Sequence, residues 1–191
     1  MSPRRAVKQE LTREMIMNVA RDLFVQQGYQ HTSMRKIAME LGYSHGSIYY
    51  HFKNKAELFY AMIEQDFQLL NKKLDEISKK KLSQEEQLKA VLFGFIEFGL
   101  KNQSHYEIMF LIKDDELKEC LADGPNVSYE KFAKVVSSLC NKNINAMIIW
   151  SVFLSLHGFV AHYCGSGQTF DELKGLAQVH VEFISKSLLI K

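Results

Sequence analysis

The sequence contains little proline and little cysteine, and each shortage excludes a class of protein. Only two prolines occur in 191 residues, at positions 3 and 125, so long stretches run without a helix breaker. Helices are therefore favoured over many short strands. The three cysteines, Cys120, Cys140 and Cys164, form no Cys-x-x-Cys pair. This spacing argues against a structural zinc site and favours a reducing compartment over a disulfide framework. We predict an all-α protein without cofactor or metal.

The chain begins Met-Ser-Pro-Arg-Arg and has no apolar stretch in its first residues, so we expect no signal peptide. One stretch, 143–170, lacks Lys, Arg, Asp and Glu and is long enough to cross a bilayer. Polar residues such as Asn145, His157 and His162 interrupt it, and Gly165-Ser-Gly167 ends it. We interpret it as a helix of a soluble core or a subunit interface, and expect a cytoplasmic protein that does not contact membranes.

Charge is distributed unevenly along the chain. Residues 1–53 hold eight Lys or Arg and four Asp or Glu, a net charge of +4. The other 138 residues hold 16 basic and 18 acidic side chains, a net charge of −2. A basic N-terminal part on a mildly acidic remainder indicates an anionic partner for the N-terminal part.

The first 53 residues predict three helices. A stripe of apolar residues at helical spacing begins near Thr12 and stops at Gly28. Ser33 can cap a second helix to Leu41, and Gly42 then permits a sharp left-handed turn. Ser44 can cap a very short third helix ending at Phe52. Such a unit is a helix-turn-helix, and we assign residues 1–53 to it.

Residues 54–191 predict a larger helical domain. Four capping-box patterns open helices in it, at Asn54–Glu57, Ser83–Glu86, Ser104–Glu107 and Thr169–Glu172. The Ser104 box predicts a short helix from Tyr106 to Leu111. Further helices are predicted over 115–121, from 126 or 128 to 139, and over 143–163.

The segment Ser44-His-Gly-Ser-Ile-Tyr-Tyr-His-Phe52 has the residues that a DNA-reading helix needs. Gly46 and Ser47 are small, so the helix can approach the major groove closely, and its exposed N–H groups favour phosphate. His45 can donate to or accept from a base edge. Lys53 and Lys55 follow as candidate phosphate contacts.

A longer pattern resembles the tetracycline-repressor (TetR) family of bacterial regulators. It comprises Gly28-Tyr-Gln-His-Thr-Ser-Met-Arg-Lys-Ile-Ala-Met-Glu-Leu-Gly42, Ser47-Ile-Tyr-Tyr-His-Phe-Lys-Asn-Lys55 and Glu57-Leu58. The resemblance covers about residues 12–60. It implies an all-helical dimer with an N-terminal DNA-binding domain and a C-terminal effector-binding and dimerisation domain. The family's DNA contacts map onto Arg35, His45, Gly46, Ser47, Tyr49, Tyr50, His51 and Lys55. Members often carry Arg or Lys in place of His45, so the operator stays open.

The C-terminal part is less informative. Tyr106-Glu-Ile-Met-Phe110 and the Trp150-x6-His157-Gly158 spacing resemble a subclass named for Trp-His-Gly. Several side chains here are suited to an apolar pocket with a few polar groups, and a filled core is the alternative. The candidate ligand-binding residues are Phe95, Phe98, His105, Tyr106, Met109, Trp150, Phe153 and His157.

The last two helices are the predicted homodimer surface. Gly158 permits close helix approach, and the stripe from Leu173 to Leu188 supplies apolar area. Two-fold symmetry would place two recognition helices about 34 Å apart on DNA. The predicted function is a repressor that a small, largely apolar effector releases from a palindromic operator.

Two alternatives remain. One is a DNA-binding regulator without a small-molecule effector, controlled by a partner protein or acting as an activator. The other is an enzyme that uses His157, His162 or Cys164. No nucleophile motif, metal-ligand spacing or phosphate loop supports the enzyme, so we predict no catalytic residues.

Overall fold

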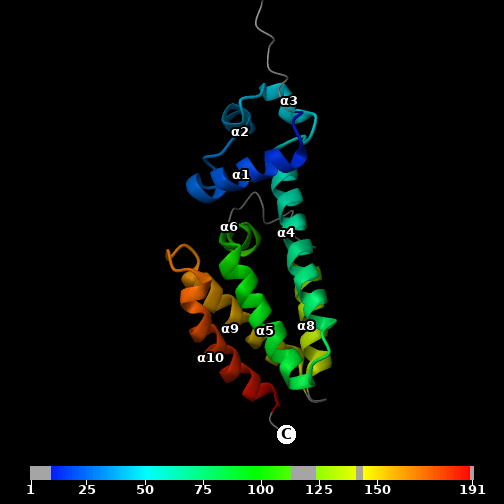
Figure 1. Ribbon diagram of the computed structural model, residues 1–191. Coiled ribbons are helices and arrows are strands. Elements are labelled where there is room, and N and C mark those ends of the chain that lie inside the picture. The colour runs from blue at the N-terminus through cyan, green and yellow to red at the C-terminus, as the bar shows by residue number, and fades with distance from the viewer. Residues whose placement is uncertain (1–9, 113–123, 141–143, 190–191) are drawn as a thin grey trace, which may run out of the picture. The chain divides into compact units, whose positions relative to one another are not determined.

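The computed structural model describes residues 10–112, 124–140 and 144–189 (Figure 1). Every regular element within these ranges is a helix, as predicted. The chain divides into two compact units, Met1–Met62 and Ile63–Lys191, which we call the head and the body. Helix α4 (Lys55–Ser78) runs through the division and contributes to both units. The functional boundary after residue 53 stays a prediction.

Three short helices build the head before α4 begins. They are α1 (Arg13–Gln27), α2 (Met34–Leu41) and α3 (His45–Tyr49). The hydroxyls of the two predicted caps, Ser33 and Ser44, each accept a hydrogen bond from a backbone N–H in the first turn of their helix, and Thr12 does the same for α1. Gly42 ends α2 with φ 68°, in the left-handed region that glycine adopts without strain. The predicted helix-turn-helix is therefore present.

The third helix is shorter than predicted. It ends at Tyr49 rather than at Phe52. The N–H groups of His51 and Phe52 both donate to the Ile48 carbonyl, at 3.0 and 3.1 Å, so the backbone tightens after the helix. This turn directs Phe52, which is 1% exposed, into the core of the head. Burial of one aromatic ring explains why the regular helix stops early.

Aromatic rings and one threonine hold the head together. The rings of Phe24, Tyr29 and Phe59 contact one another pairwise, with centroids 5.2–5.5 Å apart. The buried hydroxyl of Thr32 lies 3.2 Å from the Leu23 carbonyl oxygen and 3.0 Å from that of Gly28, so its proton is shared between the two. These contacts fix the link between α1 and α2 and so help to hold α2, against which α3 packs.

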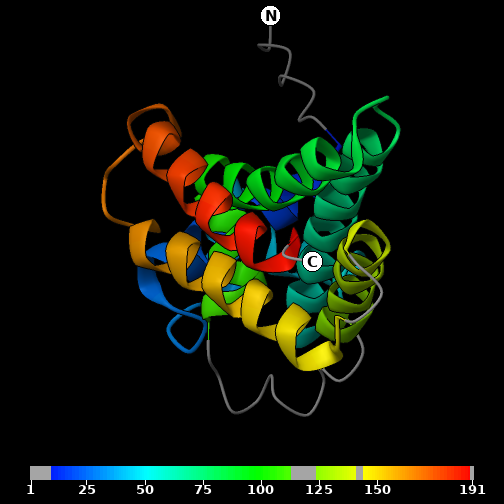
Figure 2. The same cartoon turned by 90° about the horizontal axis from the view of Figure 1, so that it is seen from below.

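The body is a bundle around α5 (Figures 1 and 2). Helix α5 contacts α8, α9 and α10, and most of its apolar side chains are buried. The helices after α4 are α5 (Gln84–Lys101), α6 (Gln103–Tyr106), the π-helix η1 (Glu107–Leu111), α8 (Gly124–Leu139), α9 (Ala146–Tyr163) and α10 (Phe170–Leu189).

The capping boxes have different outcomes. Ser83 and Glu86 exchange the two expected hydrogen bonds, and Glu172 accepts from the Thr169 N–H while donating its own N–H to the Thr169 hydroxyl. The box at Ser104 is wrong. Ser104 lies inside α6, whose first turn is already closed by the Tyr106 N–H bonding to the Asn102 carbonyl. The helical backbone is interrupted only at Asn102, between α5 and α6, so α6 does not require a new side-chain cap.

One further boundary differs from expectation, and one predicted helix cannot be compared. Helix α8 begins at Gly124, ahead of the predicted 126 or 128, and proline at 125 therefore falls in its first turn. Proline is tolerated there because the first N–H groups of a helix have no intrahelical acceptor. The helix predicted over 115–121 lies outside the described residues.

Candidate nucleic-acid interface and effector site

One side of the segment Ser44–Phe52 is anchored in the head and the other is exposed. Ile48 and Phe52 are buried in the core of the head. Tyr50 is 91% exposed and Tyr49 is 44% exposed, which is unusual for large aromatic side chains. We call the exposed side, formed by His45, Gly46, Tyr49, Tyr50 and the half-buried His51, the recognition face.

Two internal contacts order the recognition face. The hydroxyl oxygens of Ser44 and Ser47 lie 2.6 Å apart, and the Ser44 oxygen also accepts from the Ser47 N–H. Four residues apart on the helix, the rings of His45 and Tyr49 meet edge to face, with centroids 4.9 Å apart and planes at 81°. Since residues at this spacing share a helical face, Tyr49 restricts the orientation of the His45 imidazole.

Gly46 leaves space above the recognition face. A Cβ atom built on Gly46 would have no atom within 4 Å, and its backbone is in an ordinary conformation for any residue. Glycine is therefore not required there by the fold of the chain. The absence of a side chain leaves the backbone open to close approach by another molecule.

Cations surround the recognition face in two different states. Arg35 on α2 and Lys53 before α4 are exposed. Lys55, by contrast, is engaged within the head. Its ammonium donates to the Tyr29 carbonyl at 2.9 Å and lies 3.8 Å from the centroid of the Tyr29 ring. The structure therefore gives Lys55 a structural contact that the sequence pattern did not indicate.

Arg13 is a further residue that sequence reasoning missed. It begins α1, yet its guanidinium donates to the His51 carbonyl and lies 3.9 Å from the centroid of the Phe52 ring. In sequence it counts only as one more positive charge near a helix start. No periodicity signals a contact that spans 38 residues.

The predicted ligand residues mostly gather in one aromatic cluster of the body. Phe153 stacks with His157, with centroids 6.0 Å apart, and its ring is 5.7 Å from that of Phe95. Phe95 in turn meets Tyr106 edge to face at 6.1 Å. Trp150 stacks on Phe153 at 5.3 Å and is 45% exposed, so it lies at the rim. The structure thus brings together five of the eight predicted residues.

The remaining three lie nearby in sequence but differ in their contacts. Phe98 and Met109 are buried on α5 and η1. His105 on α6 bonds through Nδ1 to the fully buried carboxylate of Asp66, at 2.7 Å. Sequence reasoning missed Asp66, because a single acid within a long helix gives no signal of burial.

Polar groups within the cluster are paired. The Tyr106 hydroxyl and His157 Nδ1 lie 2.7 Å apart, and burial raises the pKa of the Tyr106 phenol well above its ordinary value. A neutral phenol in this position exchanges a hydrogen bond with the imidazole. The cluster is therefore apolar with a small number of fixed polar groups, the composition expected of a ligand site or of a satisfied core.

Cys164, proposed above as a nucleophile for the enzyme alternative, lies in surroundings that suppress its reactivity. Its sulfur is 3.5 Å from a Glu107 carboxylate oxygen, and burial together with that negative charge raises the pKa of the thiol to about 12. Thiolate is the nucleophilic form, so little of the reactive species exists at neutral pH.

We expect Cys164 to react with iodoacetamide on the order of 10³-fold more slowly than a free cysteine at pH 8, because so little thiolate is present. The measurement is the alkylation rate, followed by mass spectrometry, in a variant whose other two cysteines are serine. Replacing Glu107 with Gln should accelerate the reaction, since the opposing charge is removed. Alkylation at the rate of free cysteine would contradict the assigned environment.

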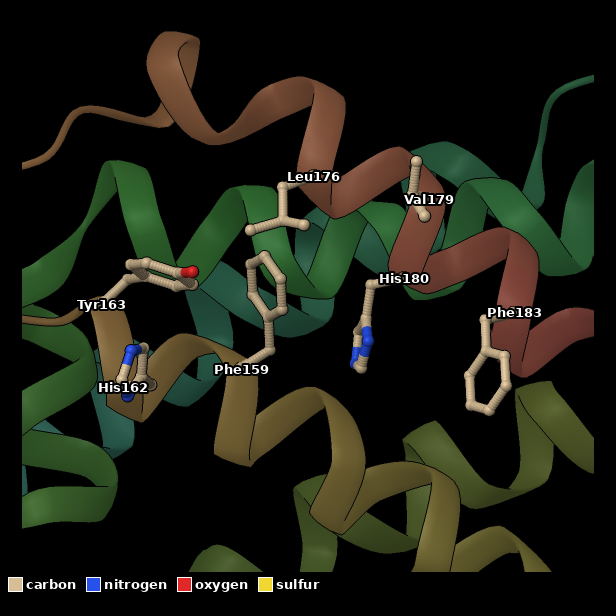
Figure 3. A pocket seen from close by; sticks show the side chains of 7 residues that line it. All are labelled: Phe159, His162, Tyr163, Leu176, Val179, His180 and Phe183. Carbon is tan, nitrogen blue, oxygen red and sulfur yellow. The ribbon is translucent and has the colours of Figure 1, made fainter.

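The exposed sides of α9 and α10 form an apolar groove of about 470 Å³ (Figure 3). Phe159, His162 and Tyr163 line it from α9, and Leu176, Val179, His180 and Phe183 line it from α10. Phe159 stacks on His180 with ring centroids 4.9 Å apart, so this contact joins α9 and α10 within the groove. Phe183 is 76% exposed at one end.

The predicted dimer stripe requires a correction. Helix α10 is apolar on two sides, and Leu173, Ala177, Ile184 and Leu188 are buried inside the body's own core. Leu176, Val179 and Phe183 are the exposed large apolar residues of α10 between Phe170 and Leu188. The stripe was assigned to one surface because helical spacing alone does not tell which apolar side faces the chain's own core.

Helix α9, from Ala146 to Tyr163, is the part of the described chain with the length and apolar character of a membrane span, and 28% of it is buried. Its exposed apolar side is continuous with the groove, where α10 lies beside it (Figure 3). A shared surface built from two helices is the arrangement of a helical subunit interface, so length and hydropathy alone do not indicate a membrane.

Comparison with known proteins supports the class of helix-turn-helix proteins. Residues 16–62 match the model of the bacterial regulatory proteins of the tetR family. An HTH-type transcriptional regulator of Staphylococcus aureus strain USA300 is 32% identical over 92 residues, which are 48% of this chain and 50% of that protein. A second regulator, of the bovine strain RF122, matches to the same extent. The chain spans about half the length of these relatives that it matches.

Solved structures extend the likeness to nearly the whole fold. The transcriptional regulator FadR from Bacillus subtilis, in complex with stearoyl-CoA, has a TM-score of 0.75 at 17% identity, over 91% of this chain and 98% of that one. NalD, the secondary repressor of the MexAB-OprM multidrug efflux pump in Pseudomonas aeruginosa, has a TM-score of 0.70 at 21% identity, over 93% and 95%. At these identities the likeness concerns the fold.

Fold and recognition face together define an all-helical protein with an N-terminal helix-turn-helix. Its residues 16–62, which include that helix-turn-helix, match the model of the tetR family of bacterial regulatory proteins. The Trp-His-Gly subclass of the body stays a prediction.

Proposed function

We propose that the chain is a cytoplasmic transcriptional regulator that binds a palindromic DNA operator as a homodimer and represses transcription until a largely apolar effector releases it. The observation that carries the proposal is the recognition face. It is exposed, polar and aromatic, and it stands on a helix anchored by Ile48 and Phe52 within a tetR-family domain. The enzyme alternative has no corresponding site among the residues that the structure describes, and we do not propose it.

On DNA, the recognition face divides into base and backbone contacts. Gly46 and Ser47 allow the N-terminal end of α3 to enter the major groove, and His45 reads a base edge there. Tyr49, Tyr50, His51 and Arg35 contact phosphates and fix the register. Lys55 can contact a phosphate as well if its ammonium gives up the hydrogen bond to the Tyr29 carbonyl. If that bond is kept, Lys55 supports α3 from within the head through its contact with the Tyr29 ring.

We expect His45→Ala to relax base preference at one position of each half-site while changing affinity for unrelated DNA little. A lost base contact removes about 1–3 kcal/mol of discrimination, whereas non-specific affinity depends on phosphates. The measurement is binding of wild type and variant to a set of duplexes with single base changes in the operator. Arg35→Ala is the matched comparison, expected to weaken all duplexes equally. An equal loss across every duplex for His45→Ala would contradict its role as a base reader.

Two copies are proposed to meet through the groove of α9 and α10. Four exposed helices would pack as a bundle, and burial of roughly 1,500 Å² in total is usual for a stable pair. A Cβ at Gly158 would have no neighbour within 4 Å in the single chain, so an incoming helix can approach α9 closely there. The interface would also cover the apolar side of α9.

Effector binding is proposed at the aromatic cluster around Tyr106, Phe153 and His157. An apolar molecule seated there would displace ring contacts, and the Tyr106–His157 pair would orient its polar end. The bond between His105 and Asp66 links the cluster's segment to α4, the helix that continues into the head. An effector that prefers one arrangement of α4 would oppose DNA binding through a coupling of about 1–3 kcal/mol.

A second candidate is a regulator without a small-molecule effector. The observation that favours it is the close contact among the rings of Phe95, Phe132 and Phe153, whose centroids lie 5.6–5.9 Å apart. Titration of the DNA complex with stearoyl-CoA and with a panel of apolar drug-like compounds separates the two. Release of DNA by one of them, lost in Tyr106→Ala, supports an effector at the cluster. Unchanged affinity with every compound favours the second candidate.

A further inference from the structure

Arg13 connects the start of α1 to the end of the recognition segment. One of its terminal nitrogens donates to the His51 carbonyl oxygen. Its guanidinium also lies over the Phe52 ring, with the central carbon 3.9 Å from the ring centroid. The side chain thus bonds the backbone at one residue and packs on the ring of the next.

These contacts lie just after the last residue of α3, a helix with few hydrogen bonds of its own. The helix has five residues, and its own hydrogen bonds are too few to fix its direction. Ser44 caps its start locally, and Ile48 and Phe52 anchor one side by burial. His51 lies two residues after the last residue of α3, so the bond from Arg13 adds a second tertiary constraint there, beside the burial of Phe52.

We propose that Arg13 is a positioning residue for DNA recognition, one that sets the direction of α3 by clamping the His51–Phe52 backbone and ring. The inference rests on the proposed DNA-binding function and adds a residue to it. A base contact depends on the orientation of α3, whereas non-specific binding depends mainly on the number of phosphates neutralised. Loss of the clamp should therefore reduce specific binding more than non-specific binding.

The test uses the full-length protein, its selected operator duplex and a scrambled duplex of equal length, at several salt concentrations. We expect Arg13→Gln to lower operator affinity about tenfold or more and affinity for the scrambled duplex less than about threefold. The slope of log affinity against log salt should stay that of wild type. Arg13→Lys should recover part of the loss, because an ammonium can still lie over the Phe52 ring.

Lys53→Gln is the matched control, with the same change of charge on an exposed cation near the same segment. It should weaken both duplexes equally and reduce the salt slope by about 0.9, as expected for one lost phosphate contact. Thermal unfolding of each variant shows whether the head remains folded at the binding temperature.

Three outcomes overturn the inference. Wild-type affinity in Arg13→Gln would show that the clamp does not matter. Equal losses on both duplexes with a reduced slope would make Arg13 a phosphate contact. A loss that disappears once the folded fraction is accounted for would make it a stability residue only. If wild type binds neither duplex in a salt-dependent way, the proposed function fails, and this result is distinct from the other three.

Discussion

Gly46→Gln is expected to abolish specific DNA binding while leaving the protein folded and slightly more stable. A Cβ atom at position 46 would have no atom within 4 Å, so we expect the head to accommodate a side chain there. Replacing a helical glycine should stabilise α3 by about 0.5 kcal/mol. On DNA, the same side chain would occupy the space through which the recognition face approaches the groove.

The expected loss is large because specific binding exceeds non-specific binding by 10³-fold or more in typical regulators. Affinity of Gly46→Gln for the operator should fall to that for scrambled DNA, a loss on the order of 10³-fold. Fluorescence anisotropy with a labelled operator measures it, and circular dichroism melting measures stability. Asn18→Gln, which places a glutamine at an exposed position of α1 by adding one methylene, is the control and should bind as wild type. Near-normal operator affinity in Gly46→Gln would mean that α3 does not enter the groove.

Phe183→Glu is expected to convert the protein to monomers. The side chain is 76% exposed in the single chain, so a charge there should leave the body folded. Within the proposed interface, however, it would bury a carboxylate among apolar groups from α9 and α10, which is strongly unfavourable. Sedimentation should show a species near 22.1 kDa instead of twice that mass.

Loss of the dimer should also weaken operator binding by about 10²-fold or more, because two linked heads bind two half-sites with the advantage of effective concentration. Binding to a single half-site should change little. Leu82→Glu, an acid placed on another exposed leucine of the body, is the control and should remain dimeric. A dimer that survives Phe183→Glu would place the interface elsewhere.

Local signals in the sequence predicted the head well. The caps at Ser33 and Ser44 and the glycine turn at Gly42 act within a few residues, so their effect can be judged without the fold. The end of α3 could not be judged in this way. It depends on the burial of Phe52 against residues distant in sequence, and on a guanidinium that comes from the start of α1.

The body was less predictable for the same physical reason. Its helices have apolar residues on more than one side, so periodicity predicted α10 but not which side faces its own core. The aromatic residues of the candidate effector site were identified by type, and most of them do gather. The pairing of His105 with Asp66 and of Tyr106 with His157 is a property of packing, and a single sequence does not encode it in local spacing.

Reading of DNA by the recognition face in two symmetric half-sites is tested most directly by selection of bound duplexes from a random DNA library with the full-length protein, followed by sequencing. We expect an enriched palindrome whose half-site centres lie about one helical turn, roughly 34 Å, or a multiple of it apart. We also expect Gly46→Gln to enrich nothing. Selection of no sequence by wild type, or of the same palindrome by Gly46→Gln, would contradict this mode of DNA reading.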